Sequence, residues 1–280
     1  MRRRYWIILG LALAVAAAAF LALASMTLFA PRNLETTALR PTAQTQTEAT
    51  ARIADMSPPP AATAAPTGES EAAAQEEPYV SPVDFDTLQA INPDVFAWLV
   101  LPDTEISYPL LRDPENDRYY MNHDSDRNFN GNGALFVEAS YNGDTLSDPV
   151  TVVYGHHMLS GLMFGYLERY YSDAEFFEEH PTFTVYTPTE TLVYEVFAAV
   201  PWSREHLLRE RDFTDARSFE DFFLTVFAIR DLRANFRETS APEAGDRVMI
   251  LSTCLTSNNT QRFLVMGKLL NGDLAPSESQ

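Results

Sequence analysis

The sequence contains a single cysteine, Cys254, among its 280 residues, so a disulfide within the chain is excluded. It is also poor in basic side chains, with 20 Lys and Arg against 39 Asp and Glu and a formal net charge of −19. Outside the first few residues no cluster of Lys and Arg could neutralise a phosphate backbone, which argues against nucleic-acid binding. Solubility is a sufficient reason for the acidity. The sequence has no CxxC or HExxH spacing and no phosphate-binding loop, so no cofactor is expected.

A long uncharged stretch follows the basic start of the chain. Residues 5–30 carry no charged side chain and come directly after three arginines. At about 1.5 Å rise per residue, a helix of this length crosses a bilayer core roughly 30 Å thick. The arginines predict a cytoplasmic amino terminus. We therefore expect residues 1–30 to form a single-pass signal-anchor in the cell membrane. A cleaved signal peptide, with a cleavage site near residues 22–24, is the alternative, and both interpretations place the remaining chain outside the cytoplasm.

The composition changes between residues 31 and 78. This stretch is rich in Ala, Thr, Pro, Glu and Gln and contains no aromatic residue. Such a segment buries too little apolar surface to offset the entropy of ordering it. We expect a flexible linker at 31–78, a folded catalytic domain at 79–272 and a disordered tail at 273–280. A tether of this kind suits an enzyme acting near the membrane or the wall, and it also suits a receptor ectodomain.

Short runs of β-branched and aromatic residues predict a strand-rich domain. The expected strands are 97–101, 106–111, 134–138, 150–154, 182–186, 191–200, 247–253 and 262–270. Helices are expected at 84–91, 162–171, 174–179 and 213–229, with Ser218 as the cap of the last. The expected fold class is mainly β with inserted helices, arranged as a β-barrel.

Cys254 is the first candidate for chemistry. The apolar residues 248–251 predict a buried strand, and Cys254 falls where this strand enters a polar loop at 256–261. The end of a strand is a place where a rigid scaffold can present a side chain to a cleft. The alternative is that the cysteine is a small buried hydrophobe. On the outside of a cell a lone thiol risks oxidation, so its presence asks for a functional reason.

Two histidines occupy a similar position at the end of another predicted strand. His156 and His157 follow the run 150–154. Because a free thiol is only a few per cent thiolate at neutral pH, a reactive cysteine needs a base or a cationic neighbour, and an imidazole supplies either. The alternatives are solvated loop histidines, or a zinc site with the distant cysteine that no spacing supports.

Arg262 follows Cys254 after a loop short enough for a hairpin. If the flanking strands pair antiparallel, Arg262 begins the second strand close to the end of the first. A guanidinium in that position can stabilise an oxyanion or hold a substrate carbonyl. The alternative is an arginine on the surface of a strand.

Several motifs, taken in order, resemble those of the class B sortases over nearly all of residues 85–270. They are FDTL at 85–88, NPDVFAWL at 92–99, YPLL at 108–111, YYMNHD at 119–124, GALF at 133–136, YGHHM at 154–158, MF at 163–164, LSTC at 251–254 and RF at 262–263. Each motif alone is weak, whereas the ordered series is specific. The helical insertion at 213–229 also resembles class B more than the smaller sortase classes.

The resemblance implies an eight-stranded sortase barrel with a reactive centre of Cys254, His156 and Arg262. It selects His156, whereas spacing alone leaves His157 equally eligible. The implied reaction is acyl transfer, in which the cysteine thiolate attacks a carbonyl in a carboxy-terminal sorting motif of a secreted protein. An amine of a peptidoglycan precursor or of a pilin lysine then resolves the thioester.

The same resemblance places Tyr154, Ser252 and Asn122 along the substrate groove. Two other interpretations remain open at this point. One is a catalytically silent, sortase-like binding module on the cell surface, which a broken triad would have favoured. The other is a secreted cysteine peptidase, although the order of histidine before cysteine differs from the papain type.

Overall fold

The structure is a computed structural model and describes residues 79–254 and 260–270. The predicted anchor at 1–30, linker at 31–78 and tail at 273–280 lie outside the described residues. Within the part of the chain that is described, no helix combines the length and apolar character needed to cross a membrane.

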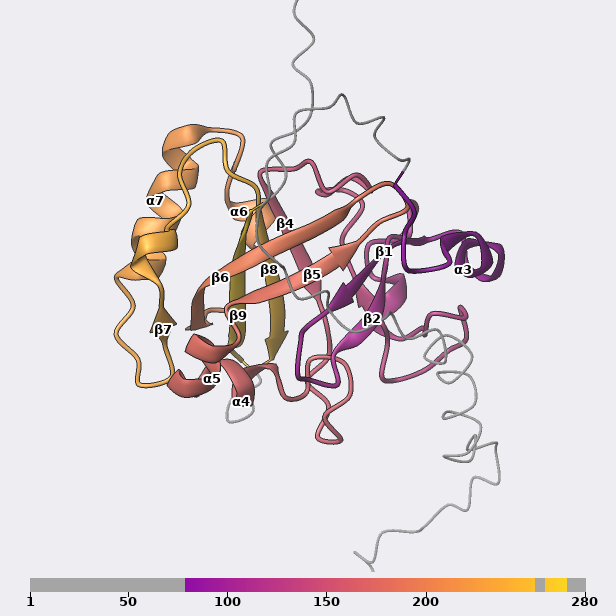
Figure 1. Cartoon of the computed structure of the whole chain (residues 1–280), viewed down its shortest axis with the longest axis horizontal. Helices are drawn as coiled ribbons and strands as arrows, with labels where there is room; N and C mark the ends of the chain where they lie inside the picture. Colours follow the sequence, from indigo (N-terminus) through magenta and orange to yellow (C-terminus); the bar gives the residue numbers. More distant parts are fainter. Residues whose placement is uncertain (1–78, 255–259, 271–280) are drawn as a thin grey trace, which may run out of the picture. The chain divides into compact units, whose positions relative to one another are not determined.

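Eight strands close into a barrel (Figure 1). They run around it in the order β5, β1, β2, β3, β4, β8, β9 and β6, and β6 pairs back onto β5. Their bounds are β1 Val95–Val100, β2 Ser107–Leu111, β3 Leu135–Phe136, β4 Val150–Tyr154, β5 Thr182–Tyr186, β6 Thr191–Trp202, β8 Val248–Cys254 and β9 Arg262–Leu269. The expected eight-stranded barrel is therefore confirmed, and closure leaves these strands without a free edge in the ring.

Strand β6 is the longest of the described strands and pairs with three others. Its first half pairs with β5, whereas Ala198 and Ala199 pair with a ninth strand, β7 (Asn235–Phe236). The pairing with β9 is irregular between Val196 and Ala198, which is typical of a bulge that bends a strand. Beyond this bulge β6 stays paired with β9 as far as Trp202, and the connection to α7 follows the end of the strand.

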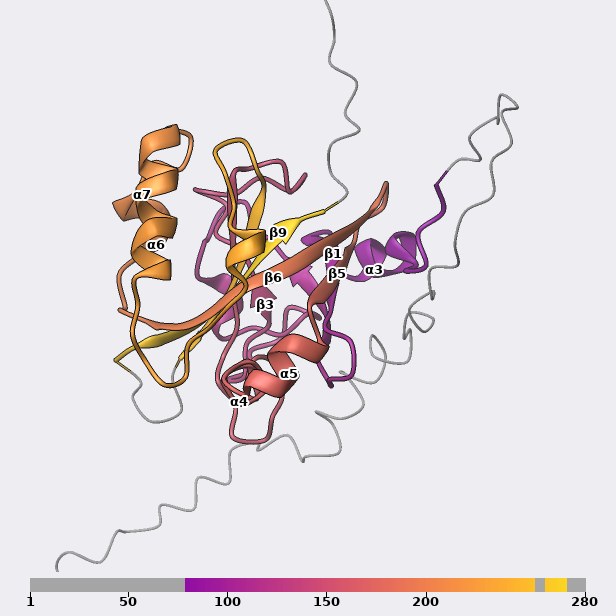
Figure 2. The same ribbon diagram turned by 60° about the vertical axis from the view of Figure 1, so that its left-hand side comes forward.

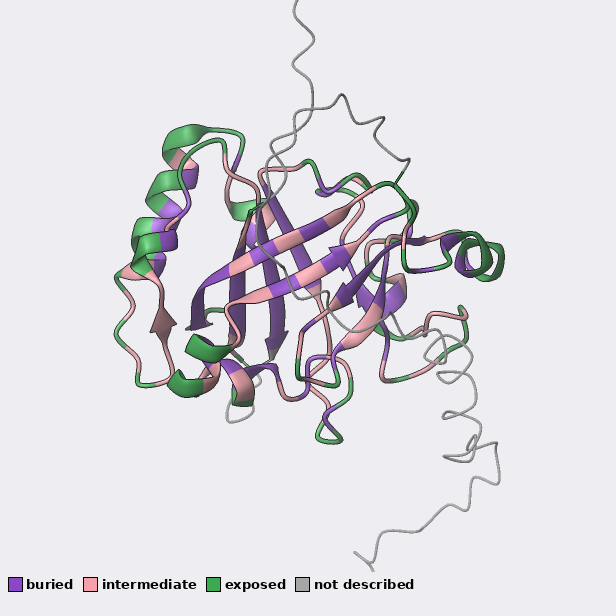
Figure 3. Ribbon diagram, viewed as in Figure 1, coloured by how far each residue is buried: buried purple, intermediate pink, exposed green. Residues whose placement is uncertain are grey.

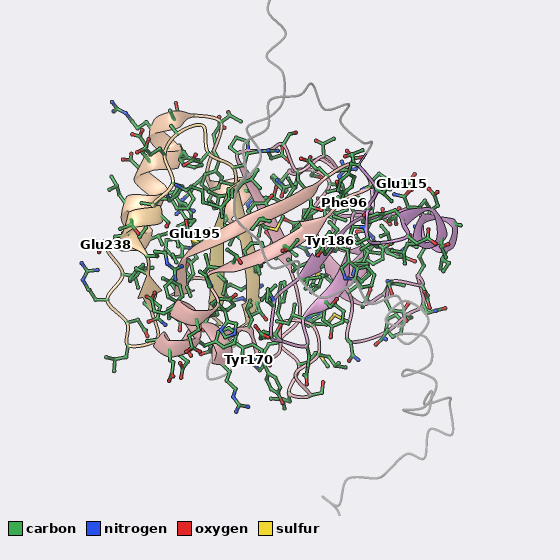
Figure 4. All side chains as sticks on the ribbon, in the orientation of Figure 1. Phe96, Glu115, Tyr170, Tyr186, Glu195 and Glu238 are labelled. Atoms are coloured by element: carbon green, nitrogen blue, oxygen red, sulfur yellow. The ribbon has the colours of Figure 1, made fainter. Side chains whose placement is uncertain are left out.

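Strands β4 and β8 bury nearly all of their described residues, whereas β5 and the first half of β6 alternate between buried and half-buried residues, as Figure 3 shows. Val153, Leu251 and Val265 are fully buried toward the barrel interior. Their neighbours Val152 and Ile250, one residue away in sequence, belong to a second cluster outside it. This alternation follows from the two-residue period of a strand. Figure 4 shows side chains filling the space between the strands.

Short helices surround the barrel, and the helices α3 and α7 lie on opposite sides of it in both views (Figures 1 and 2). Helix α7 covers the outer cluster with four buried side chains: Phe219, Phe222, Phe223 and Val226. The bounds are α3 Phe85–Ile91, α4 Leu167–Tyr171, α5 Ala174–Glu179, α6 Leu207–Glu210 and α7 Ala216–Phe227, with 3-10 turns at Tyr119–Met121 and Glu238–Ser240.

Two helix predictions are wrong in detail. Ser218 does not cap α7; Asp215 does, because its Oδ1 accepts a hydrogen bond of 2.8 Å from the Ser218 amide. The helix expected from residue 162 begins only at Leu167. Gly161 and Met163 have φ of +85° and +55°, and this left-handed backbone cannot continue a right-handed helix.

Candidate active site

The predicted site residues gather at one rim of the barrel. Strands β4, β8 and β6 end at this rim and β9 begins there, because β4 and β8 are parallel and β9 is antiparallel to β8 and β6. Tyr154 pairs with Ser252 between β4 and β8, and Cys254 pairs with Arg262 between β8 and β9. Trp202 of β6 is the partner of Arg262 on its other side. Segments more than 100 residues apart thus meet at one edge.

The arginine and the tyrosine of this rim are electrostatically linked. Burial raises the pKa of the Tyr154 hydroxyl well above its ordinary value, and the Glu138 carboxylate raises it further. The positive charge of Arg262 acts in the opposite direction. The charge of Arg262 therefore acts on the Tyr154 hydroxyl.

His156 stands two residues beyond the end of β4. The Gly155 amide donates to the Ser252 carbonyl at 3.1 Å, so the pairing with β8 continues up to the histidine. The Nε2 atom of His156 lies 2.7 Å from the carbonyl oxygen of Met121. A carbonyl only accepts, so Nε2 must carry the hydrogen, and Nδ1 is the nitrogen left to exchange a proton.

A glycine allows the loop to pass close behind this histidine. Gly133 has φ of +59°, and a Cβ atom there would lie 3.1 Å from Cδ2 of His156 and 2.5 Å from the carbonyl oxygen of Tyr120. Only glycine fits this left-handed and crowded position without displacing its neighbours. The half-buried imidazole is therefore held between Gly133 and the Met121 carbonyl.

A buried polar network fixes the loop that carries the Met121 carbonyl. The Tyr120 hydroxyl donates to Oδ2 of Asp94 at 2.6 Å and accepts from the Asn92 amide at 2.9 Å. Arg127 forms an ion pair with the same oxygen of Asp94 at 2.5 Å. These contacts tie the 3-10 turn Tyr119–Met121 to the turn before β1. The Met121 carbonyl thereby gains a rigid support.

The three predicted substrate residues lie on or next to this rim. Ser252 lies near the end of β8 and is 5% exposed, and the ring of Tyr154 stacks on Phe136 with centroids 5.5 Å apart. Asn122 is exposed and directly follows Met121, and its carbonyl accepts a 2.8 Å hydrogen bond from the Asn130 amide. The structure thus brings all three near His156, and their contact with substrate stays a prediction.

One wall of the rim was not anticipated from the sequence. The connection 203–211, between β6 and α7, is held by Glu205, whose Oε1 accepts from Nε1 of Trp202 at 2.7 Å and from Arg211 at 2.8 Å. Since Trp202 is the register partner of Arg262, these contacts fasten the connection beside the arginine. Pairing between β6 and β9 depends on barrel closure, so no local sequence signal could reveal it.

A cavity of about 370 Å³ lies behind this wall, lined in part by Tyr141, Val150, Arg211 and Phe213. None of the predicted site residues lines this cavity. The candidate site is therefore defined by the residues that the strand register brings to the rim. No group of three or more His, Cys, Asp or Glu suited to a metal occurs within residues 79–254 and 260–270.

Comparisons with known proteins agree with this arrangement. A family model of the sortase domain matches residues 99–270. Sortase B of Listeria monocytogenes is 32% identical over 185 residues, which cover 65% of this chain and 72% of that protein.

Two solved structures are similar in fold. A class B sortase of Streptococcus pyogenes involved in pilus biogenesis has a TM-score of 0.57 and 28% identity, covering 67% of this chain and 98% of that one. A Staphylococcus aureus sortase B–substrate complex has a TM-score of 0.57 and 27% identity, covering 69% of this chain and 86% of that one. The chain therefore belongs to the sortase family of cysteine transpeptidases, and within it to class B.

Proposed function

We propose that this chain is a membrane-anchored transpeptidase that joins secreted proteins to an amine at the cell surface. It cleaves a carboxy-terminal sorting motif through a thioester on Cys254. The acyl group then passes to an amine of a peptidoglycan precursor or of a pilin lysine.

One observation carries the proposal: Cys254 and Arg262 are register partners at the rim where Tyr154 leads into His156. This register supports a site in which the thiol, the imidazole and the guanidinium needed for acyl transfer come from three separate segments of the chain. The relatives add support, because one was solved with a substrate and another is a sortase involved in pilus biogenesis.

The first half-reaction begins with the thiolate of Cys254 and the imidazolium of His156. The sulfur attacks the carbonyl carbon of the scissile peptide bond and forms a tetrahedral oxyanion. The oxyanion collapses, the C–N bond breaks, and His156 transfers its proton to the leaving amine. Because Nε2 is engaged by the Met121 carbonyl, Nδ1 is the atom that gives up this proton.

The second half-reaction reverses these roles. The incoming amine attacks the thioester carbonyl, His156 accepts the proton of that amine, and the C–S bond breaks to release the new amide. Arg262 stabilises the oxyanion in both steps. Removing one such donor costs about 3–4 kcal/mol of transition-state stabilisation in enzymes where it has been tested.

The proposal includes a location. The uncharged run 5–30 and the arginines before it support an anchor with a cytoplasmic amino terminus and an extracytoplasmic domain. An anchored enzyme would meet its secreted substrates and its amine acceptors at the same surface.

The full chain, purified in detergent, is incubated with a library of peptides bearing candidate sorting motifs, with and without an added amine. Mass spectrometry follows the mass of the enzyme and of the products. We expect a covalent adduct on Cys254 and an amide product that requires the amine. Cys254→Ala and His156→Ala should each abolish the adduct without changing the thermal unfolding midpoint.

Three results would contradict the proposal. Full activity in either variant would remove that residue from the reaction. Products that contain only hydrolysed peptide at every amine concentration would instead favour a cysteine peptidase, and binding without any adduct would favour a silent binding module.

A further inference from the structure

The loop between β4 and α4 presents two leucines to solvent beside the candidate active site. Leu159 is 86% exposed and Leu162 is 42% exposed. They stand three and six residues after His156, and neither takes part in the reaction described above. Large apolar side chains that are exposed next to one another mark a contact with a partner or a membrane, whereas single scattered ones do not.

The loop that carries these leucines is braced at its base. The Phe164 amide donates to the His156 carbonyl at 3.1 Å, and His157 forms an antiparallel bridge with Met163. The Met163 amide also donates to the hydroxyl of Tyr108 at 3.3 Å, which ties the loop to β2. A loop fixed in this way holds its tip outward, so a partner does not have to order it on binding.

The loop also differs in charge from the rest of the domain. Residues 149–167 contain no Asp, Glu, Lys or Arg, in a chain with a formal net charge of −19. Two exposed acidic side chains share the rim with the loop, Asp103 and Glu105 in the turn between β1 and β2, and Oδ2 of Asp103 lies 3.4 Å from Nε2 of His180. Four others stand before β4 and β8, at the opposite end of the barrel: Asp144, Asp148, Glu243 and Asp246. An anionic surface repels that end more than it repels the loop.

The described chain begins at the end of the barrel opposite to this loop. The hydroxyl of Tyr79 lies 2.9 Å from Oγ1 of Thr191, at the turn between β5 and β6. From Thr191, β6 runs 12 residues to Trp202 at the rim, which is roughly 40 Å at about 3.3 Å per residue. In Figures 1 and 2 the loop that leads into α4 projects at the lower edge of the barrel, and the described chain begins near the top. The linker expected at 31–78 could extend to roughly 160 Å, so its length lets the rim turn toward the membrane.

The shape of the loop favours a lipid surface over a folded partner. Neither the cavity of about 370 Å³ nor a second one of about 180 Å³ is lined by residues of this loop. A protein partner needs a surface that matches it in shape, whereas a bilayer adapts to a projecting apolar tip.

We propose that the loop 157–165 contacts the lipid bilayer, with Leu159 and Leu162 placed between the headgroups and the acyl chains. The contact is apolar, because the loop has no Lys or Arg with which to bind phosphate. It turns the rim that carries Cys254 and His156 toward the membrane, where the substrates and amine acceptors of the proposed reaction are held. This inference rests on the proposed function for the membrane location of the chain.

The first test measures the contact itself. The full chain is inserted into nanodiscs of phosphatidylcholine that carries bromine on its acyl chains, which quenches only tryptophans that reach them. Leu159→Trp is the reporter, and the signal of wild type, with its three tryptophans, is subtracted. We expect quenching about threefold stronger than for Leu232→Trp, a fully exposed position after α7, because only the first side chain enters the lipid. High salt should leave this quenching unchanged, since an apolar contact is not screened.

The second test measures the orientation of the rim. Transfer of a sorting peptide is followed with diglycine that is either free in solution or attached to a phospholipid headgroup. The double variant Leu159→Gln/Leu162→Gln should lower kcat/KM for the lipid-attached amine about tenfold, because the rim spends less time at the surface, and should change that for the free amine less than about twofold. Leu224→Gln, at a 68% exposed position on α7, is the matched control and should change neither.

Quenching of Leu159→Trp no stronger than that of Leu232→Trp would overturn the inference. So would quenching that disappears in high salt, because that result indicates adsorption by charge. An equal fall with the free and the lipid-attached amine would assign the leucines to the substrate site instead. The two proposals fail separately: a wild-type chain that transfers no peptide to either amine contradicts the proposed function, whereas the quenching experiment requires no reaction.

Discussion

Cys254 and Arg262 are directly paired across the antiparallel strands β8 and β9. Directly opposed residues in such a pair have Cα atoms roughly 4.5–5.5 Å apart. The relative position of the two residues is therefore set by the sheet and not by the loop that joins the strands. A change in the loop can alter what enters the site without separating the pair.

Arg262→Lys should lower kcat about 100-fold, within the range observed when one oxyanion donor is removed. An ammonium keeps the charge but cannot reproduce the planar fork of donors of a guanidinium. Steady-state kinetics with a sorting peptide measure the change. Arg217→Lys on the exposed face of α7 is the control, and equal kinetics in the two variants would assign Arg262 to a surface role.

Gly133→Ala should displace His156 and destabilise the fold. The new Cβ would lie 2.5 Å from the Tyr120 carbonyl oxygen, in a backbone with φ of +59°. We expect a loss of about 1–3 kcal/mol in the free energy of unfolding, together with lower activity. Urea denaturation measures the first effect.

Gly131→Ala provides the matched comparison two residues earlier, because nothing lies within 4 Å of the position of its Cβ. It should be close to neutral in both assays. A Gly133→Ala variant that is equally neutral would show that the loop does not approach His156 as described.

Tyr120→Phe should weaken the support of the Met121 carbonyl. The substitution removes the hydroxyl that bonds to Asp94 at 2.6 Å and to Asn92 at 2.9 Å, and it leaves the fully buried Asn92 short of a partner. We expect the free energy of unfolding to fall by about 1–3 kcal/mol. Tyr119→Phe loses only a 3.3 Å hydrogen bond in an exposed position, and a loss as large as that of Tyr120→Phe would contradict the argument.

Asp231 should make the free energy of unfolding depend on pH. The Arg233 side chain and amide donate to its carboxylate and lower the pKa of Asp231 from 3.8 to about 2. Since the folded pKa is depressed, the stabilisation is complete above pH ~4 and is lost as the pH falls toward about 2, with about half remaining at pH 3.

The difference in Tm between wild type and Asp231→Asn should therefore shrink between pH 6 and pH 3. Asp221→Asn on the exposed face of α7 is the control. A Tm difference that stays constant across this range would rule out the Arg233 contact as its cause.

Strands with clear boundaries were predictable. Residues 150–154 and 182–186 match β4 and β5 because proline or a turn residue stands at each end of an apolar or alternating run. Strand β3 is shorter than expected, since Ala134 and Val137 donate to Tyr120 and Leu111 outside the ladder. The two-residue β7 has no pattern that could distinguish it from a loop.

The pairing of Cys254 with Arg262 followed from a hairpin argument, and the placement of Tyr154 and Ser252 along one groove followed from the family resemblance. The Met121 carbonyl and Gly133 could not be predicted in the same way. Each acts through a backbone or side-chain contact between segments that meet only after the barrel has closed, so local periodicity carries no information about them.

The central position of β8 and β9 has a consequence for the timing of activity. These two strands lie between β4 and β6, so a growing chain that stops before residue 248 has one open sheet, in which β4 and β6 have not yet been joined. The cysteine and the arginine arrive on the same pair of strands that closes this sheet into a barrel. Completion of the triad and closure of the barrel thus depend on the same two strands, and no chain that ends before residue 254 carries the nucleophile.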